Sequence, residues 1–594
     1  MQTKTSVQAD FAAAVAAFQR GDAAGARRWG LRVVEADPAN GHAHHLLAAV
    51  AEQTGDVIEA LTRFGKAVPL LPDDPQLANN FANALAAQGD VEGAMIEYRR
   101  AVALDPGFVE ALVNLGLTAG LTYYDEGLDA LRRATALDPG SAKAWLALGV
   151  LLREGGDLDA AREALARADA LASRNPQIVQ ALAVVEAASG GDPLPYLDRA
   201  SALLPGDPEL ALERAAALER RGDGAEAADY LAGLLRGAPA WQMGHLALSQ
   251  LRWQLGEGAT STRSFEEALS KTPDDVELRL AWLSTLQRAD RNADALALVD
   301  KDRERFAVRP EAESFARRIE AVAAAENGDL ARAAPLFAAE DIGADVNFGV
   351  SAMRFLLRSQ RPADAAALGE RLLQIHDNRA IWAHLATAWR LTEDRRADWL
   401  DDARLIAVID IEGLDLAALA DTLRSLHVAK AHPFDQSLRG GTQTEGHLLL
   451  RSDPTIRALR QALDGAVGQY IADLPPPDPT HPTLRERRDG FRIATSWSVR
   501  LGAQGFHINH FHSEGWLSSA FYVALPPATD TGPAGWLSLG QPSVELGLDL
   551  PALATIHPTP GRLVLFPSTL WHGTIPFDDG ERLTVAFDVV PKGR

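Results

Sequence analysis

Helix-breaking, small and apolar residues recur at a fixed spacing along residues 8–395 of the chain. Prolines suited to ending a helix recur in steps of mostly 34 residues, at Pro38, Pro72, Pro106 and Pro139, and later at Pro205, Pro239 and Pro273. Gly-Asp pairs keep the same step at Gly21-Asp22, Gly55-Asp56 and Gly89-Asp90. Because proline cannot continue a helix and glycine favours a turn, this pattern predicts a series of helix–turn–helix units.

Between these breaks, small and bulky residues stay in register from one unit to the next. A small column contains Ala48, Ala82, Gly116 and Gly149, and a bulky column contains Phe64, Tyr98, Leu131 and Leu165. Small residues let two helices approach closely, and a bulky side chain fills the groove between them. The columns therefore predict pairs of closely packed antiparallel helices.

The repeat resembles the tetratricopeptide repeat, whose W-x-x-L-G signature is matched by Trp145-Leu-Ala-Leu148-Gly149. The resemblance covers residues 8–395, about eleven units at this period, with degraded spacing after about residue 175. It implies an all-α superhelix over residues 1–398 whose concave groove binds a peptide or protein. A rigid spacer or a dimerisation surface is the alternative role.

After Trp399 the repeat stops, and short β-type runs follow. Residues 404–411 are expected to form a strand, and residues 414–427 and 454–473 to form helices. Further strands are predicted at 491–501, 505–512, 517–525, 535–539, 562–566 and 583–590. Short strands with Gly and Pro turns favour a jelly roll with flanking helices over residues 399–594. The last helical pair, around Ile381–Trp399, is a candidate to pack on this barrel.

Composition and charge exclude several classes of function. The chain has 594 residues, a formal net charge of −22 and no cysteine. Nucleic-acid binding needs clustered Lys and Arg, which are not found, whereas an acidic surface permits a basic peptide partner. Without cysteine, disulfides and thiolate metal sites are excluded, so a metal must bind to His, Asp or Glu. The sequence shows neither the apolar core of a signal peptide nor a run of eighteen apolar residues, so no membrane contact and a cytoplasmic location are expected.

A histidine-rich segment carries the candidate chemistry. In Gly505-Phe-His-Ile-Asn-His-Phe-His-Ser-Glu-Gly515, alternation along a strand places His510 and His512 on one face and Phe511 on the other. His572 follows a strand about sixty residues later. Three ligands on one side of a metal leave positions open for a keto-acid and O₂, as in non-haem iron oxygenases. His507 and Asn509 are expected to face away from the ligands and to pack or lie at the surface.

Three further residues are candidates to bind the keto-acid. Arg582 lies ten residues after His572 at the head of the last predicted strand, and Thr584 follows on the same face. A guanidinium holds a carboxylate through two parallel hydrogen bonds, and the hydroxyl of Thr584 adds a third. Tyr522 is either a core aromatic or a hydroxyl donor to the same molecule.

Residues 430–594 resemble the 2-oxoglutarate- and Fe(II)-dependent oxygenases, and more narrowly a bacterial and phage branch often fused to tetratricopeptide repeats. The resemblance rests on motifs that include Asn-His-x-His (509–512), Gly-Trp-x-Ser-Ser (515–519), Leu-Phe-Pro-Ser (565–568) and Trp-His-Gly (571–573). It implies a double-stranded β-helix, Fe(II), 2-oxoglutarate and O₂, and hydroxylation of a substrate. Because the repeats are expected to recruit a peptide or protein, protein hydroxylation is the leading hypothesis. A scaffold with an inactive jelly roll and an oxygenase for a small molecule are the alternatives.

The sequence departs from the usual His-x-Asp/Glu pattern of these oxygenases, because His512 stands where an acid is expected. Two ligand sets remain open. Either His510, His512 and His572 bind the metal together, or His512 and Glu514 form the His-x-Glu pair and His510 lies behind them. All of these residues lie beyond residue 500, so the barrel alone is expected to bind metal and keto-acid.

Overall fold

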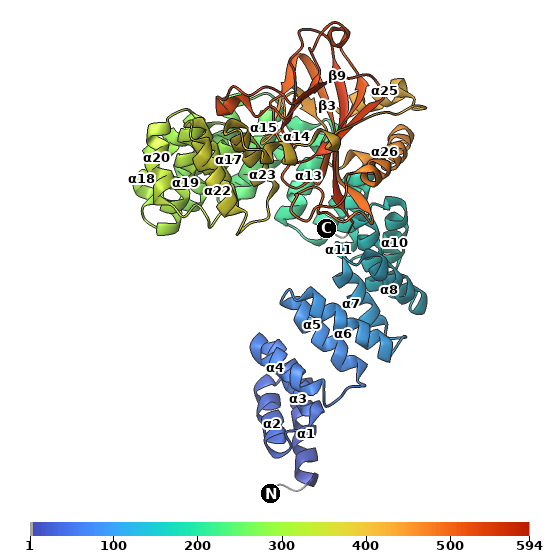
Figure 1. Ribbon diagram of the computed structural model, residues 1–594. Coiled ribbons are helices and arrows are strands. Elements are labelled where there is room, and N and C mark those ends of the chain that lie inside the picture. Colours follow the sequence, from blue (N-terminus) through green and yellow to red (C-terminus); the bar gives the residue numbers. More distant parts are fainter. Residues whose placement is uncertain (1–3, 593–594) are drawn as a thin grey trace. The chain divides into compact units, whose positions relative to one another are not determined.

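The computed structural model describes residues 4–592 and divides into two compact units, residues 4–185 and residues 186–592. The first unit consists of helices alone, and the second combines helices with β-sheet (Figure 1). The expected domain boundary at residues 398/399 lies inside the second unit, within helix α24 (Arg396–Leu400), which follows helix α23 (Arg379–Leu391) and precedes strand β1 (Ala407–Asp410).

The first unit is a regular series of helical pairs. Its helices are α1 (Lys4–Gln19), α2 (Ala23–Ala36), α3 (Gly41–Thr54), α4 (Val57–Ala67), α5 (Pro75–Ala87), α6 (Val91–Leu104), α7 (Val109–Ala119), α8 (Tyr124–Leu137), α9 (Ala142–Glu154) and α10 (Leu158–Leu171). Helix α11 (Pro176–Ser189) runs from this unit into the second.

The Gly-Asp pairs form the turn between α1 and α2, between α3 and α4, and between α5 and α6. Gly21, Gly55 and Gly89 adopt positive φ angles of 76°, 77° and 79°, which suit glycine. The next residue is the N-cap of the following helix: Asp22 accepts a hydrogen bond from the amide of Gly25, and Asp90 from that of Gly93. A carboxylate at this position satisfies a free amide and favours the positive end of the helix.

The small and bulky columns form the core of the first unit. Phe64, Leu131 and Leu165 are fully buried. A Cβ atom at Gly116 would overlap the side chain of Leu131, and one at Gly149 would overlap that of Leu165. The glycines are therefore needed for the close approach of the paired helices, as the columns predicted.

The second unit begins with further helices of less regular length and spacing. They are α12 (Leu194–Leu203), α13 (Pro208–Arg221), α14 (Gly224–Gly237), α15 (Gln242–Gln254), η1 (Gly258–Thr262), α16 (Arg263–Lys271), α17 (Val276–Arg288), α18 (Asn292–Phe306), α19 (Pro310–Glu326), α20 (Leu330–Ala339), α21 (Val346–Arg358), α22 (Pro362–Leu372), α23 and α24 (Arg396–Leu400).

Two antiparallel sheets form the β part of the second unit. The six-stranded sheet has the order β1-β7-β4-β9-β3-β2, with β2 (Leu438–Gln443), β3 (Phe491–His507), β4 (Leu517–Ala524), β7 (Arg562–Pro567) and β9 (Arg582–Pro591). The three-stranded sheet has the order β6-β5-β8, with β5 (Leu537–Leu539), β6 (Ala554–Ile556) and β8 (His572–Thr574). Helices α25 (Leu416–Leu426) and α26 (Pro454–Asp473) contribute Leu419, Leu463 and Val467 to the core of the large sheet. This arrangement is the helical array followed by a jelly roll with flanking helices that the sequence predicted.

Several element boundaries differ from the sequence-based prediction. Residues 491–501 and 505–507 belong to one long strand, β3, and the short strands β2, β6 and β8 were not predicted. The predicted strand over 505–512 ends at His507, because the chain beyond it leaves the ladder with β2. Strands β6 and β8 have only three residues each, which leaves too little alternation to be recognised, and β2 contains two glycines, which are depleted in strands.

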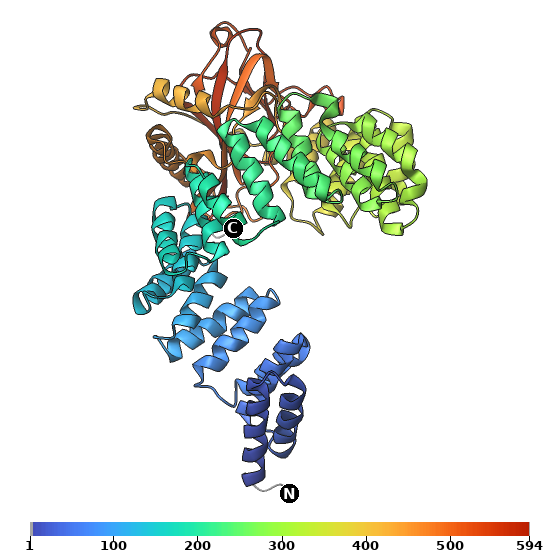
Figure 2. The ribbon, with the colours of Figure 1, turned by 180° about the vertical axis from the view of Figure 1, so that it is seen from behind.

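Within the second unit, the late helices pack directly on the β part (Figure 2). The indole Nε1 of Trp571 donates to the carbonyl of Ala383 and to Oγ1 of Thr387 on α23, at 3.0 and 3.1 Å. Arg390 on the same helix donates to the carbonyls of Gly540 and Pro551. The expected packing of the last helical pair on the barrel is therefore confirmed.

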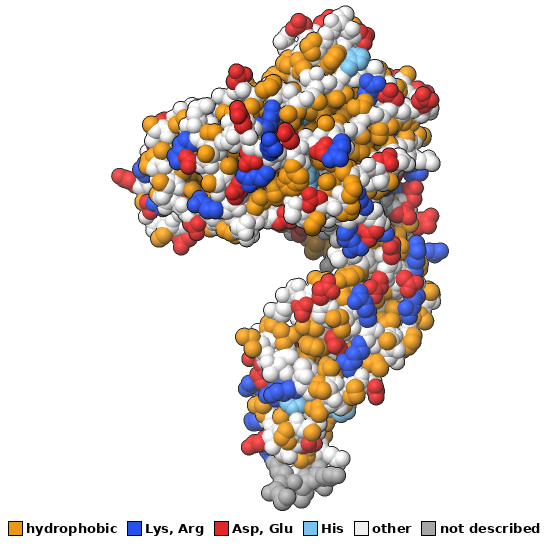
Figure 3. All heavy atoms as spheres, viewed as in Figure 1, with side chains coloured by type: hydrophobic (Ala, Val, Ile, Leu, Met, Phe, Trp, Pro, Cys, Tyr) orange, Lys and Arg blue, Asp and Glu red, His pale blue; other side chains and the backbone are white. Residues whose placement is uncertain are grey.

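The surface carries charges of both signs. On the face drawn in Figure 3, acidic and basic side chains are interspersed. Many are paired along or between helices, such as Arg63 with Glu59 and Arg354 with Glu326. Among residues 4–592, no helix has the length and apolar character needed to cross a lipid bilayer.

Candidate metal centre

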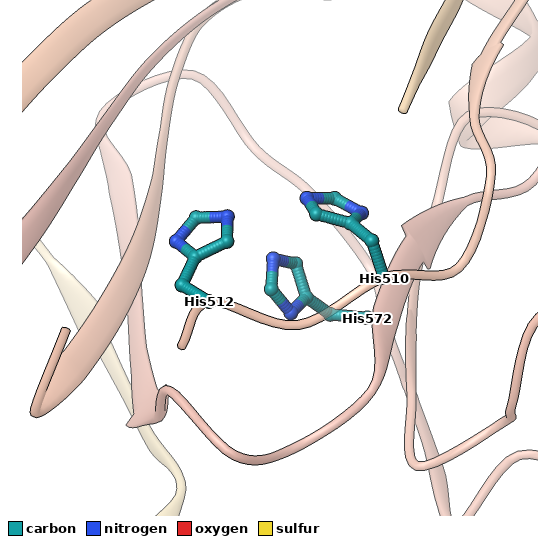
Figure 4. Close-up of side chains that lie close together, drawn as sticks. All are labelled: His510, His512 and His572. Atoms are coloured by element: carbon teal, nitrogen blue, oxygen red, sulfur yellow. The ribbon is translucent and has the colours of Figure 1, made fainter. Parts of the chain in front are cut away.

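Three histidines from two distant segments meet inside the β part of the second unit (Figure 4). One ring nitrogen from each of His510, His512 and His572 lies within 4.8 Å of the others. The ring centroids of His510 and His572 are 4.2 Å apart, and that of His512 lies 5.0 Å from His572. Such a group of nitrogens within reach of one point can hold a single metal ion.

Backbone pairing brings the two segments together. His510 and His572 exchange two backbone hydrogen bonds of 2.9 and 2.8 Å, which form an isolated antiparallel bridge beyond the end of β3. The amide of His512 donates to the carbonyl of Ser568 at 2.9 Å. Residues 510–512 are thus held in an extended conformation although they lie outside a regular strand.

The outer ring nitrogen of each histidine already has a partner. Nδ1 of His510 lies 2.9 Å from the carbonyl oxygen of Ile508, and Nδ1 of His572 lies 3.0 Å from that of Leu570. Nδ1 of His512 lies 2.6 Å from Oδ1 of Asp588. Because these oxygens accept hydrogen bonds, each Nδ1 carries the proton and each Nε2 keeps its lone pair. This is the orientation of metal-binding histidines, so the donor set fits a divalent metal such as Fe(II).

The protonation of the three rings follows from their surroundings. Burial, together with the neighbouring His512, lowers the pKa of His510 to about 3. Burial and the adjacent His510 and His512 hold the pKa of His572 well below its usual value. For His512, burial acts in the same direction, but the charge and hydrogen bond of Asp588 outweigh it and raise the pKa. His510 and His572 are therefore neutral and able to bind a metal at neutral pH.

A cavity of about 50 Å³ joins the histidines to Arg582. Its other lining residues are Trp497, Val499, His507, Ser519, Ala520, Leu537, Gly573, Thr574, Thr584 and Ala586. One water needs only about 10–15 Å³ by this measure, so the cavity admits a small molecule or several waters. Most of its wall is apolar, which keeps bulk water away from the polar groups.

Arg582 is a buried cation without a carboxylate partner among the described residues. It is 2% exposed, and its Nε donates to the carbonyl of Gly535 at 3.1 Å. Its guanidinium carbon lies 5.1 Å from the ring centroid of Tyr522. Burial lowers the pKa of Arg582, a shift that Tyr522 opposes. An unpaired buried charge is costly, so this position favours an anionic ligand.

The other predicted site residues take different positions. Thr584 lines the cavity and is 4% exposed. Tyr522 is fully buried opposite Thr584 in the β4–β9 ladder, and its hydroxyl meets no partner with good hydrogen-bond geometry in the described chain. Glu514 is exposed in the turn after His512 and does not join the histidine cluster.

Two residues near the histidines, His507 and Asp588, were not predicted correctly from the sequence. His507 was expected to face away, yet it lines the cavity, and its ring centroid lies 5.5 Å from that of His510. The alternation rule fails here because the strand ends between these two residues. Asp588, which holds His512, was missed. The only signal in the sequence was an acid within the apolar run of the last strand.

Phe511 lies on the opposite side of the chain from its two histidine neighbours, as predicted. Its ring packs against Trp571 and His384, with centroid distances of 4.9 and 5.4 Å. His384 on α23 is fully buried and also packs against Trp571 at 5.4 Å. Candidate ligands and helix-facing aromatics thus alternate at both histidine segments, so α23 supports them from behind.

Comparisons with known proteins agree with both parts of the chain. Residues 495–588 match the family described as "Putative 2OG-Fe(II) oxygenase", and residues 82–120 and 121–176 match tetratricopeptide repeat families. Over 85 residues the chain is 41% identical to tetratricopeptide repeat protein 36 of Bos taurus, which covers 14% of this chain and 45% of that protein. The counterpart from Mus musculus is 40% identical over 79 residues, or 13% of this chain and 42% of that protein. The chain therefore spans less than half the length of these relatives.

Among solved structures, a tetratricopeptide repeat protein from Parabacteroides merdae is similar, with 17% identity and a TM-score of 0.33. The similarity covers 41% of this chain and 98% of that one. The protein TTC0263 of Thermus thermophilus is 25% identical with a TM-score of 0.26, over 30% of this chain and 98% of that one.

Proposed function

Because the chain joins tetratricopeptide repeats to a domain that matches the 2OG-Fe(II) oxygenases, we propose that it is a 2-oxoglutarate- and Fe(II)-dependent oxygenase that hydroxylates a peptide or protein. One observation carries the proposal: a single cavity contains three histidines with free Nε2 atoms and a buried arginine with no carboxylate partner in the described chain. The first group suits a metal, and the second suits an anionic co-substrate.

His510, His512 and His572 are the proposed ligands of Fe(II). Their Nδ1 hydrogen bonds fix the rings so that the three Nε2 atoms approach one another. Bound Fe(II) would supply the activation of O₂ that is coupled to decarboxylation of 2-oxoglutarate. Glu514 is not needed for this ligand set, since it lies exposed outside the cluster.

Arg582 and Thr584 are the proposed anchor for the far carboxylate of 2-oxoglutarate. Arg582 can donate two parallel hydrogen bonds, and the hydroxyl of Thr584, on the same strand, can donate a third. Tyr522 lies beside the guanidinium, where its hydroxyl could also reach the carboxylate. The apolar side chains of Val499, Leu537 and Ala586 surround this region and exclude water, which strengthens these polar contacts.

The helical repeats are the proposed binding site for the substrate. Repeats of this kind form concave surfaces suited to extended chains. A substrate segment held there reaches the cavity at a raised effective concentration, so binding and positioning both favour turnover. The acidic net charge of −22 further favours a basic peptide.

Anaerobic loading with Fe(II), followed by turnover with 2-oxoglutarate and O₂, tests the proposal. We expect about one Fe(II) per chain and metal-dependent formation of succinate. Incubation with lysate proteins, followed by a search for peptides that gain one oxygen atom, identifies the substrate. Iron binding without succinate under any substrate condition would instead indicate a scaffold.

Metal content of two variants tests the ligand set. His510→Ala should lose Fe(II), while Glu514→Ala should keep most of it, because Glu514 lies outside the cluster. The reverse ranking would identify the His-x-Glu pair as the ligands. Circular dichroism of both variants controls for loss of folding.

A further inference from the structure

The three histidines differ in what holds them from behind. His510 and His572 donate to neutral backbone carbonyls, whereas His512 donates to the carboxylate of Asp588. The contact between His512 and Asp588 is also the shortest of the three, at 2.6 Å. His512 occupies the position where related oxygenases are expected to have an acid. Among the described residues, the carboxylate that contacts a proposed ligand is that of Asp588, which lies behind His512.

Asp588 is fixed in place by its neighbours. In the β4–β9 ladder it lies opposite Ser518, whose hydroxyl donates to Oδ1 of Asp588 at 2.8 Å. The same hydroxyl lies 3.0 Å from Nδ1 of His512 and 2.9 Å from Oγ of Ser568. A Cβ atom at Gly515 would come within 3.1 Å of Cγ of Asp588, so the chain also packs closely over the carboxylate. Asp588 is therefore oriented before any ligand binds.

In the described part of the chain, the charge of Asp588 is not balanced by a Lys or Arg side chain. It is 9% exposed, and among the described residues its ion-pair partner is His512 alone. A buried carboxylate without Lys or Arg is costly unless another positive charge compensates it. A divalent cation on Nε2 of His512 would provide that charge through the ring. Arg582, in the same cavity as His512, is the opposite case, a buried cation without an anion.

We propose that Asp588 is the acidic member of the metal centre, acting through His512 rather than by direct contact with the metal. It orients the ring and makes Nε2 of His512 a stronger electron-pair donor to the metal. It also offsets part of the positive charge of the metal, which three neutral histidines alone would leave uncompensated. This inference rests on the proposed function, because it assigns a positioning role at the same site. Hydrogen-bonded carboxylates behind metal-bound histidines act in this way in other sites.

The charge of Asp588 should affect the binding of metal and the binding of 2-oxoglutarate differently. Removal of the carboxylate should weaken metal binding, because His512 becomes a poorer donor and the positive charge is less well balanced. It should not weaken binding of 2-oxoglutarate once the metal is bound, because an anion is attracted to a more positive site. A variant that merely disturbs the fold would weaken both.

Asp588→Asn is the appropriate substitution, because its amide oxygen can still accept the hydrogen bond from Nδ1 while the charge is lost. Co(II), which is stable in air, serves as the metal probe with the full-length protein. We expect Asp588→Asn to bind Co(II) about 10- to 100-fold more weakly than the wild type. At saturating Co(II), its affinity for 2-oxoglutarate should be equal or higher.

Two control variants separate charge from structure. Asp549→Asn removes the same charge from an exposed loop residue of the β part and should leave Co(II) binding unchanged. Ser518→Ala removes the supporting hydroxyl but keeps the carboxylate, so it should affect Co(II) binding less than Asp588→Asn does. Melting temperatures without metal show whether each variant is folded.

The possible outcomes are distinct. Equal Co(II) affinity of Asp588→Asn and wild type, with both folded, would overturn the role of Asp588. Parallel loss of Co(II) and 2-oxoglutarate affinity would also overturn it, in favour of a structural role. If the wild type itself bound no Co(II), the proposed function would fail instead, whatever Asp588 does.

Discussion

The helices before and after residue 185 share one repeat pattern but differ in regularity. In the first unit, helices α1 to α10 have 11–16 residues, and the first three glycine-aspartate turns recur at a step of 34 residues. In the second unit, α12 and α16 shorten to 10 and 9 residues, and η1 interrupts the series. Helix α18 is kinked at Asp302, which is buried in an ion pair with Arg279. The helices of the first unit pack on each other, whereas α23 in the second unit also packs on the β part.

This difference shows how a second neighbour changes a repeat. A helix that contacts only the adjacent repeats can keep one pattern of small and bulky residues. Helix α23 must also fit Trp571, Phe511 and the loop containing Gly540, so its sequence meets additional constraints. Loss of repeat spacing after residue 175 thus accompanies the change from an independent array to one integrated with another fold.

Truncation provides the largest test of this comparison. A chain of residues 176–594 keeps the second unit and should bind Co(II) and 2-oxoglutarate like the full-length protein. A chain of residues 399–594 should aggregate or fail to bind metal, because Trp571 and Leu546 belong to a core shared with the late helices. This reverses the expectation from sequence that the barrel alone suffices. Solubility, melting and Co(II) titration of both fragments check it, and a stable metal-binding 399–594 fragment would refute the shared core.

Removal of one arginine from each unit should have very different effects. Arg582→Ala should weaken 2-oxoglutarate binding by about 2–4 kcal/mol, the scale of a lost buried charge pair, while metal binding survives. Arg27→Ala removes a half-exposed partner of Glu59 in the first unit and should leave this affinity unchanged. Calorimetric titration of the metal-loaded protein measures both. Unchanged affinity in Arg582→Ala would mean that the anchor lies elsewhere.

Acid should destabilise the second unit through His384. Burial lowers the pKa of this histidine to about 4. As the pH falls from 6.5 toward 4, the unfolded chain takes up a proton that the folded protein excludes. The free energy of unfolding should therefore decrease, by at most about 3 kcal/mol for this group.

Melting with a metal chelator at pH 7.5 and pH 5 measures this effect. His384→Gln should show a smaller loss of stability at pH 5 than the wild type. His42→Gln, at an exposed position of the first unit, should behave like the wild type. Equal acid sensitivity of His384→Gln and wild type would exclude His384 as a cause.

Substitution of one tryptophan in each unit gives the smallest contrast. Trp571→Phe leaves the buried Oγ1 of Thr387 and the carbonyl of Ala383 without their indole donor, which should cost about 1–3 kcal/mol. Trp145→Phe removes one exposed hydrogen bond to the carbonyl of Pro139 and should cost less than about 1 kcal/mol. Denaturant titration compares the two. Equal costs would argue against tight packing between α23 and the metal-binding segment.

The sequence predicted the first unit and the histidine cluster well, for related reasons. Both can be recognised from spacing along the chain. Phe64 and Tyr98 are 34 residues apart, as the repeat requires, and His510 and His512 are two residues apart. His572 was found because its neighbours form a recognisable motif. The packing of Trp571 on Ala383, by contrast, joins residues 188 positions apart and leaves no periodic signal.

Asp588 and His507 show a second limit of sequence reasoning. Asp588 is hidden in an apolar strand, and only the register of β4 and β9 reveals that it lies beside His512. The position of His507 depends on where β3 ends, and helix and strand ends are the least certain part of such a prediction. Geometry at the ends of strands therefore had to come from the structure.

The pairing of His510 with His572 also bears on the order in which the protein matures during synthesis. Helices α12 to α24 leave the ribosome before any proposed metal ligand, and domains fold mainly from the N-terminal end. Trp571 and Asp588 are made after all of these helices, so the Trp571-binding face of α23 stays uncovered until they emerge. We expect chaperones to be needed most at this stage, and iron to bind only after His572 has been made.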